Sequence, residues 1–173
     1  MSTTNRLMAI AVVSCAAFGS GAYAASDFKV MPGSACQPRS PNDRQDILAL
    51  LDRVINANPT DPAFVICPIV RDNTSPIPSA FMQVRLVVKR SSNGEPVSCV
   101  LDSRDDDGTQ IERSEGSDGT GTGTDGRNLF LVVKENPERN GYYVVQCRLP
   151  PGNPGGTVVS YRFSERSPTD QNN

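Results

Sequence analysis

Short apolar runs separated by Pro, Gly, Asn and Asp recur along the chain after its first 24 residues. The alternation is clearest between Phe81 and Lys89, where apolar side chains occupy every second position from Met82 to Val88. Side chains two residues apart in a strand point to the same face of a sheet, so this run predicts a strand with one buried face. Apolar runs of this kind predict strands at Ala63–Val70, Phe81–Lys89, Val97–Ser103, Leu129–Lys134, Tyr142–Leu149 and Thr157–Phe163.

Turn signals between these runs indicate antiparallel pairing. Asn93-Gly94 is a strong hairpin dipeptide, and it predicts a hairpin between the strand that ends at Lys89 and the strand that begins at Val97. Glu135–Gly141 predicts a second tight connection, between the strands on either side of it. We therefore predict an all-β fold, an antiparallel β-sandwich of the immunoglobulin-like or jelly-roll-like kind.

One segment departs from the strand pattern. Apolar residues between Ile47 and Ile55 recur at helical spacing, and Ser40-Pro41 upstream supplies a plausible N-cap with Pro at the first helical position. We predict at most one short helix in the fold, near residues 43–52. The alternative is that Val54–Ala57 begins another strand.

The first 24 residues are typical of a secretory signal. Arg6 supplies a positive charge, Leu7–Phe18 is an apolar run too short to span a bilayer, and Ala22-Tyr23-Ala24 fits an A-x-A cleavage site. We expect cleavage after Ala24 and a secreted or periplasmic mature protein. The alternative is the lipobox-like Val12-Val13-Ser14-Cys15, in which Cys15 would be lipidated.

The remaining chain divides into three parts. Residues 25–40 are predicted to form an N-terminal arm, residues 41–163 a single β-sandwich domain, and residues 164–173 a disordered tail. No later segment is long and apolar enough to predict a membrane span. The formal net charge is −2, and loss of Arg6 with the signal changes it to −3. A charge this small, without a basic stretch, predicts no nucleic-acid partner.

Five cysteines occur, and four remain once Cys15 is set aside with the signal. An even set in a small exported protein predicts two disulfides. Cys67, Cys99 and Cys147 share strand faces with apolar residues, whereas Cys36 lies in a Pro- and Gly-containing coil. Three connectivities are open. We favour Cys36–Cys67 and Cys99–Cys147. Without a C-x-x-C pair or any His, we predict no zinc site and no redox pair.

The absence of His also limits catalysis. It excludes Ser-His-Asp and Cys-His chemistry and the usual general base near neutral pH. Ser26-Asp-Phe-Lys29 has the S-x-x-K spacing of penicillin-binding enzymes, but it lies near the expected mature N-terminus without the partner motifs. We therefore predict no catalytic residues and no cofactor. A carboxylate-based hydrolase is the enzymatic alternative, and without Trp its sugar platform would have to come from Tyr142, Tyr143 or Tyr161.

The acidic, glycine-rich segment from Asp102 to Asn128 is the place where a specific ligand deserves consideration. Asp105-Asp106-Asp107-Gly108 is similar to the centre of an EF-hand loop, although Ser occupies the positions that need Asp and a bidentate Glu. We expect a long solvated loop between strands. If calcium binds there, the candidate ligands are Asp102, Asp105, Asp106 and Asp107.

Five segments of the chain, taken in their order, resemble the spaced cysteine signatures of a group of short, secreted, uncharacterised bacterial proteins. They are Met31–Cys36, Cys67–Asn73, Cys99–Ser103, Tyr142–Pro151 and Ser160–Glu165. The resemblance implies an exported β-rich domain and no particular chemistry. We expect a non-catalytic binding or structural accessory module that contacts a protein or a cell-surface ligand through its strand edges or loops. A calcium-dependent binding module is the first alternative.

Overall fold

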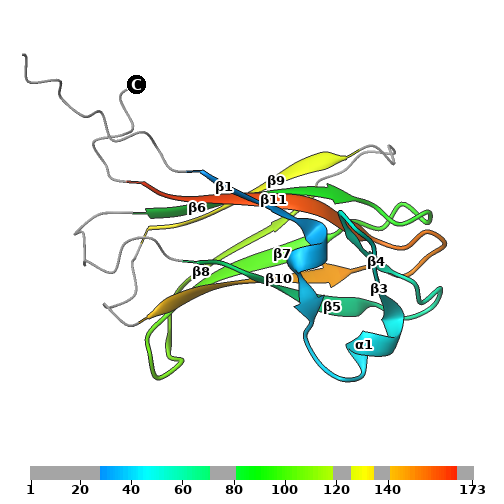
Figure 1. The fold of residues 1–173 in the computed structure, drawn as a ribbon, viewed down its shortest axis with the longest axis horizontal. Helices are drawn as coiled ribbons and strands as arrows, with labels where there is room; N and C mark the ends of the chain where they lie inside the picture. Colours follow the sequence, from blue (N-terminus) through cyan, green and yellow to red (C-terminus); the bar gives the residue numbers. More distant parts are fainter. Residues whose placement is uncertain (1–27, 71–80, 119–125, 135–140, 167–173) are drawn as a thin grey trace, which may run out of the picture.

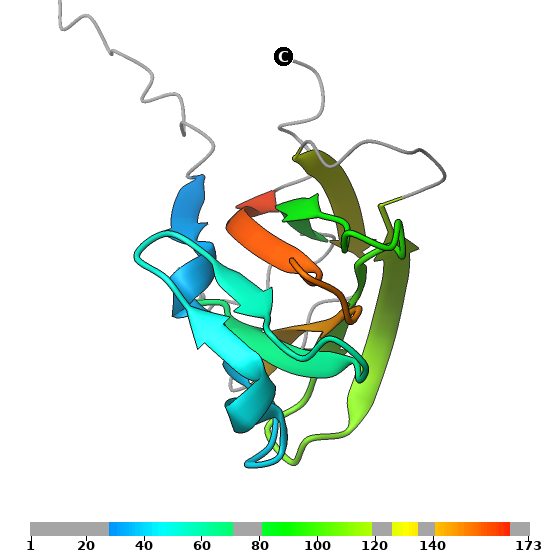
Figure 2. The same ribbon diagram turned by 90° about the vertical axis from the view of Figure 1, so that its right-hand side faces the viewer.

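Two antiparallel sheets stacked face to face form the computed structural model, which describes residues 28–70, 81–118, 126–134 and 141–166 (Figures 1 and 2). The six-stranded sheet has the order β3 (Ile47–Ala49), β4 (Val54–Asn56), β11 (Thr157–Arg166), β6 (Phe81–Lys89) and β9 (Arg127–Val133), and β1 (Lys29–Pro32) also pairs with β11. The five-stranded sheet has the order β2 (Gln37–Pro38), β5 (Ala63–Pro68), β10 (Tyr142–Leu149), β7 (Ser98–Arg104) and β8 (Gln110–Ser117). The predicted all-β antiparallel sandwich with two disulfides and one short helix is confirmed.

The core lies between the sheets and is mainly aliphatic. The alternation in β6 has the predicted effect, because Met82, Val84, Leu86 and Val88 are all 0% exposed. From the other sheet, inward side chains of β5, β7 and β10 meet them, among them Val65, Leu101, Val145 and Leu149. Burying a side chain of this size contributes about 1.5–3 kcal/mol, so the interleaved faces supply most of the driving force for folding.

The N-terminal segment contributes one strand to each of the two sheets. β1 pairs with β11 in one sheet, and β2 pairs with β5 in the other. Between them, the 3-10 turn η1 (Gly33–Ala35) passes so close to β11 that a Cβ on Gly33 would lie 2.0 Å from the Val158 carbonyl oxygen. Only glycine fits there. The expected arm at 25–40 therefore includes two strands.

The predicted helix is much shorter than expected. α1 covers only Asp43–Asp46, and Ile47 at its C-terminal end is already extended, with φ −101° and ψ 119°. Residues 47–49 form β3, which pairs with β4. The prediction of a helix near 43–52 is wrong beyond residue 46, and the alternative strand at Val54 is present. Pairing with β11 buries Val54 completely, which outweighs the helical spacing of this segment.

The predicted hairpin at Asn93-Gly94 is wrong in its pairing. The turn at Asn93-Gly94 forms as expected, with Gly94 at φ 80° and its N–H donating to the Ser91 carbonyl at 2.9 Å. However, it joins β6 to β7, and these strands belong to different sheets. The Glu135–Gly141 connection likewise joins β9 to β10 across the sandwich, and its residues 135–140 lie outside the described part of the chain. Turn residues specify a local reversal, whereas the long-range partners of a strand select its sheet.

The segment Asp102–Asn128 is not one long loop. It contains the end of β7, the whole of β8 and the start of β9, and β8 pairs along β7 from Ser117 to Gln110. β8 is an edge strand with the sequence Gln-Ile-Glu-Arg-Ser-Glu-Gly-Ser, so it lacks the apolar alternation of a half-buried strand. β11 also continues to Arg166, three residues past the predicted end at Phe163.

The expected signal segment and its cleavage site, residues 1–24, lie outside the described part of the chain. Within the described ranges, no helix has the length and apolar character needed to cross a bilayer.

Candidate binding surface on the six-stranded sheet

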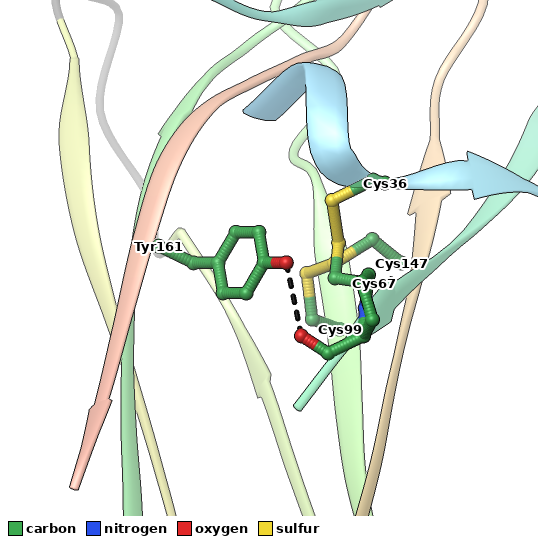
Figure 3. The surroundings of a disulfide bond; sticks show 6 residues. Cys36, Cys67, Cys99, Cys147 and Tyr161 are labelled. Atoms are coloured by element: carbon green, nitrogen blue, oxygen red, sulfur yellow. Dashed lines mark hydrogen bonds between the residues drawn. A yellow bond between two sulfur atoms is a disulfide. The ribbon is translucent and has the colours of Figure 1, made fainter. Parts of the chain in front are cut away.

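The four cysteines form two disulfides in the favoured pairing. Cys36 is joined to Cys67 and Cys99 to Cys147, side by side on the inner side of the five-stranded sheet (Figure 3). Cys99 and Cys147 lie directly opposite each other on β7 and β10. All four are at most 3% exposed. Their role is therefore structural, as links between neighbouring strands of one sheet.

The calcium candidates are placed in two different environments. Asp102 lies in β7, is 3% exposed, and accepts hydrogen bonds from Arg113 Nε at 2.7 Å and Arg104 Nη2 at 2.9 Å. Burial alone would raise the pKa of Asp102, but the hydrogen bonds and charges of Arg113 and Arg104 outweigh it and lower that pKa. Its carboxylate is already neutralised by these two guanidinium groups.

The other three candidates lie in the turn between β7 and β8. Asp105 accepts a bond from Gly108 N–H at 3.0 Å through its carbonyl, and Asp107 Oδ1 accepts one from Thr109 N–H at 2.7 Å. In the described ranges, no group of three or more His, Cys, Asp or Glu side chains is gathered in a way that could hold a metal ion. The Asp105 carbonyl and the Asp107 carboxylate therefore stabilise the turn.

The tyrosines named for a sugar platform do not gather on one surface. Tyr143 and Tyr161 are 3% and 1% exposed, and the Tyr161 hydroxyl donates to the Pro68 carbonyl at 2.9 Å between the sheets (Figure 3). Tyr142, at 38% exposure, is the first residue of β10 in the five-stranded sheet, whereas Tyr161 belongs to the six-stranded sheet. This arrangement offers no stacking surface built from these three rings.

A different surface emerges from strand register. Val30 of β1 pairs with Arg162 of β11, Arg162 pairs with Arg85 of β6, and Arg85 pairs with Phe130 of β9. These four residues form a row across four neighbouring strands, which we call the arginine row. Arg85, Arg162 and Phe130 are each flanked along their strands by core residues, and Val30 is followed by Met31, which packs against the core, so the row faces outward.

The two arginines of this row have no acidic partner among the side chains that the structure describes. Arg85 Nε donates to Asn128 Oδ1 at 2.7 Å, and its guanidinium carbon lies 5.3 Å from the centroid of the Phe130 ring. Arg162 lies 5.2 Å from the Phe28 ring centroid. Neither makes an ion pair with a carboxylate whose side chain the structure describes. The aromatic contacts hold both cations without neutralising them.

Several other arginines of the chain have acidic partners. Arg90 pairs with Asp118 at 2.9 Å, Arg113 with Asp102 at 2.7 Å, and Arg39 approaches Asp43 at 4.0 Å. The chain has more acidic than basic residues, 19 against 17. On this face, two arginines directly opposite each other both lack an acid among the described side chains, despite that excess of acidic residues.

Apolar side chains surround the two cations. Val30 is 68% exposed, Phe130 is 53% exposed, and Phe28 is 37% exposed. A pocket of about 200 Å³ opens beside the guanidinium groups, and its lining residues are Val30, Arg85, Val87, Ser160, Tyr161 and Arg162. A β-bulge between Val158 and Ser160 lies at this pocket. Bulges re-aim side chains, and here the bulge coincides with the only strand that contributes three lining residues.

A larger groove of about 560 Å³ follows β2 and is lined by Gln37, Pro38, Arg39, Ser40, Pro41 and Arg44. Arg39 already stacks on the Phe64 ring at 3.9 Å and lies within ion-pair distance of Asp43. Its charge is thus partly neutralised. Its apolar lining residues are the two prolines, Pro38 and Pro41, without an aromatic or branched aliphatic side chain, so we regard it as the weaker candidate.

The sequence analysis did not identify this surface. Arg85 stood out only as a polar position in an alternating strand, and Arg162 and Phe130 as single residues in other runs. Their proximity depends on the register between paired residues that are 45 positions (Arg85 and Phe130) to 132 positions (Val30 and Arg162) apart in the chain. No local signal contains that register.

No protein-family model matches this sequence, and no curated protein matches it. Among solved structures, the chain is similar to the enzymatically active domain of tailspike protein 4 of bacteriophage CBA120, with a TM-score of 0.46 and 12% identity over 81% of this chain and 19% of that one. It is also similar to a structure described as "CBM4 structure and function", with a TM-score of 0.35 and 11% identity over 80% of this chain and 86% of that one. The chain thus spans about a fifth of the tailspike chain. Similarities this distant carry no conclusion about function.

Proposed function

We propose that this protein is an exported, non-catalytic binding module that contacts its ligand through the outward face of the six-stranded sheet. The observation that supports the proposal is the arginine row, in which two adjacent arginines, without an acidic partner among the described side chains, lie among exposed apolar side chains. Export is supported by two buried disulfides, which persist in oxidising compartments, and by the expected signal at residues 1–24.

The isolated protein gains little from such a face. Like charges directly opposite each other on neighbouring strands destabilise a sheet by roughly 0.2–1 kcal/mol. Exposed Phe130 and Val30 add apolar surface that a solvated outer face of a sandwich does not need. A ligand that supplies negative charge and apolar contact would remove both costs at once, and this favours binding as the purpose of the surface.

The proposal is tested by retention of the full chain, purified after export, on insoluble matrices of different chemistry. A suitable panel is cellulose, chitin, an alginate gel and phosphatidylglycerol vesicles. For whichever matrix retains the protein, we expect the double substitution Val30→Ser with Phe130→Ser to weaken retention at least about 10-fold, or about 1.4 kcal/mol.

Tyr142→Ser is the matched control, because it removes an exposed ring from the other sheet. It should leave retention unchanged. Equal loss in both variants, or no retention of the wild-type protein by any member of the panel, would contradict the proposed contact surface.

A further inference from the structure

We propose that the arginine row binds an acidic polysaccharide, an inference that rests on the proposed function. One carboxylate of a sugar unit lies between Arg85 and Arg162, and the ring of that sugar unit lies in the adjoining pocket. The first property required of the ligand is a negative charge. Both guanidinium groups belong to one face, and neither is paired with a carboxylate whose side chain the structure describes. Charge complementarity therefore selects an anionic ligand.

The geometry favours a single planar acid group shared by the two side chains. Arg85 and Arg162 are direct cross-strand partners, so their Cβ atoms lie roughly 4.5–5.5 Å apart. Arg85 is oriented by Asn128, while the guanidinium of Arg162 makes no hydrogen bond to a side chain or carbonyl of the described residues. A guanidinium presents its donors as a planar fork that matches a carboxylate, and such charge-assisted bonds are stronger than neutral ones.

The pocket beside the arginines fits one sugar ring of such a polymer. Val30 and Val87 supply apolar side chains to its lining, and Ser160 brings a hydroxyl. A pyranose ring has the same mixture, with C–H groups on its faces and hydroxyls at its edge. Phe28 and Phe130 lie on either side of the arginines and can contact the neighbouring units of a chain that runs across the strands.

An acidic peptide fits this face less well. Extended peptides are bound mainly through main-chain hydrogen bonds along a sheet edge. β11 and β6 are inner strands of the sheet, and their backbone groups are used in pairing with β1, β4 and β9. The outward face offers side chains alone.

A membrane surface also fits less well. Membrane-binding surfaces lower their apolar side chains into the lipid while the cations remain at the headgroups. Here the two arginines lie between the apolar ends of the row, with Val30 on one side and Phe130 on the other. Immersing those side chains would take both guanidinium groups into the lipid with them.

The test is calorimetric titration of the full, disulfide-bonded chain with alginate oligosaccharides. We expect Arg85→Ala and Arg162→Ala each to weaken binding about 10-fold or more, since each removes a hydrogen-bonded charge contact. Arg85→Lys and Arg162→Lys keep the charge but lose the planar fork, and should weaken binding by an intermediate factor. Arg148→Gln removes one charge from the outward side of the other sheet and should change affinity less than about 2-fold. Thermal unfolding of each variant verifies that it is folded.

Four comparison ligands decide the chemical class. Weaker binding to dextran, to dextran sulfate, to polyglutamate and to phosphatidylglycerol vesicles than to alginate supports the proposal. If neutral dextran binds as tightly as alginate or more tightly, the ligand need not be an anion and the proposal is overturned. If dextran sulfate binds as tightly as alginate or more tightly, the preference for a carboxylate is overturned. Tighter binding to polyglutamate than to alginate would reject the polysaccharide in favour of an acidic peptide. Tighter binding to the vesicles than to alginate would reject it in favour of a membrane surface.

These outcomes separate the two proposals. Binding of a neutral matrix that still depends on Val30 and Phe130 would leave the contact surface standing and reject its acidic ligand. Alginate binding that is insensitive to Arg85, Arg162, Val30 and Phe130 would reject both.

Discussion

Among single residues, arginine shows how strongly context decides the role of a side chain. Arg90 and Asp118 form a pair whose side chains are 8% and 0% exposed, while Arg113 and Glu115 form a looser pair at 3.7 Å, with Glu115 64% exposed. The first pair is removed from water and the second is not. Their contributions to stability should therefore differ greatly.

We predict that Asp118→Ala lowers the free energy of unfolding by about 3–5 kcal/mol, because it leaves the Arg90 charge buried without its partner. Glu115→Ala is the control, and its cost should stay below about 1 kcal/mol. Urea-induced unfolding measures both. Similar costs for the two variants would show that the Arg90–Asp118 pair is not effectively buried.

Asp102 gives a prediction about pH. Its pKa is lowered from the ordinary value of 3.8: burial opposes this change, and Arg113 and Arg104 outweigh burial. A lowered pKa in the folded state stabilises the protein above the unfolded value, and that stabilisation is lost as the pH falls through the folded value. The difference in free energy of unfolding between the wild type and Asp102→Asn should be largest near neutral pH and shrink below about pH 4. Denaturant titrations from pH 7 to pH 2 measure it, and a difference independent of pH would contradict the assignment.

At the scale of elements, the disulfides act on individual strand junctions. Cys99–Cys147 links two inner strands, β7 and β10, whereas Cys36–Cys67 holds the two-residue β2 at the edge of the sheet. The linked cysteines are 31 and 48 residues apart in the sequence, and loops of this size correspond to about 4 kcal/mol each in the chain-entropy treatment.

We predict that the double substitutions Cys36→Ser/Cys67→Ser and Cys99→Ser/Cys147→Ser each lower the free energy of unfolding by about 2–4 kcal/mol. They should differ in hydrogen exchange. Loss of Cys36–Cys67 should deprotect chiefly β2 and the Arg39 amide, which donates to the Phe64 carbonyl, while loss of Cys99–Cys147 should raise exchange in β7 and β10. Identical exchange patterns would contradict a local role for Cys36–Cys67.

The strands also differ in how well the sequence predicts them. β6 and β10 match their predicted bounds because each alternates between a buried and a less buried face over eight or nine residues. β8 was missed because most of its side chains are polar and partly or fully exposed. β3 lies in the segment predicted as a helix, because three residues are too few to show the two-residue alternation of apolar and polar side chains that marks a strand.

At the scale of the whole molecule, side-chain hydrogen bonds connect the two sheets, and two of them join residues far apart in the sequence. Asn56 of β4 is completely buried and donates to the Leu149 carbonyl at the end of β10 at 3.0 Å. Tyr161 of β11 donates to the Pro68 carbonyl at the end of β5 at 2.9 Å. Each contact spans 93 positions of the sequence, so it reports on the packing of one sheet against the other.

We predict that Tyr161→Phe lowers the free energy of unfolding by about 0.5–1.5 kcal/mol at neutral pH. Burial raises the pKa of Tyr161 from 10.0 to about 12, so its stabilising effect is fully present below pH 10 and is lost as the pH rises toward 12. The advantage of the wild type over Tyr161→Phe should therefore shrink across that window. Unfolding at pH 7 and at steps above pH 10 measures it, and a constant difference would argue against a buried hydroxyl.

The two outward faces of the sandwich differ in a way that only the complete molecule shows. On the five-stranded sheet, Asp102 is neutralised by arginines on its own and the neighbouring strand. On the six-stranded sheet, Arg85 and Arg162 face outward together without an acid among the described side chains. The ligand experiments on the arginine row therefore test a property of the assembled sheet.

The sequence by itself determined the all-β class, the inward positions of β6 and the partly apolar faces that bear Cys67, Cys99 and Cys147, because burial on one side of a strand leaves a period of two in the residues themselves. Tertiary structure alone decided which strands share a sheet, that Asn93-Gly94 crosses between sheets, and that Arg85 stands opposite Arg162. The physical reason is that side-chain burial is recorded locally, whereas pairing and register depend on the combined packing of strands far apart in the chain. The proposed binding surface belongs to that second category.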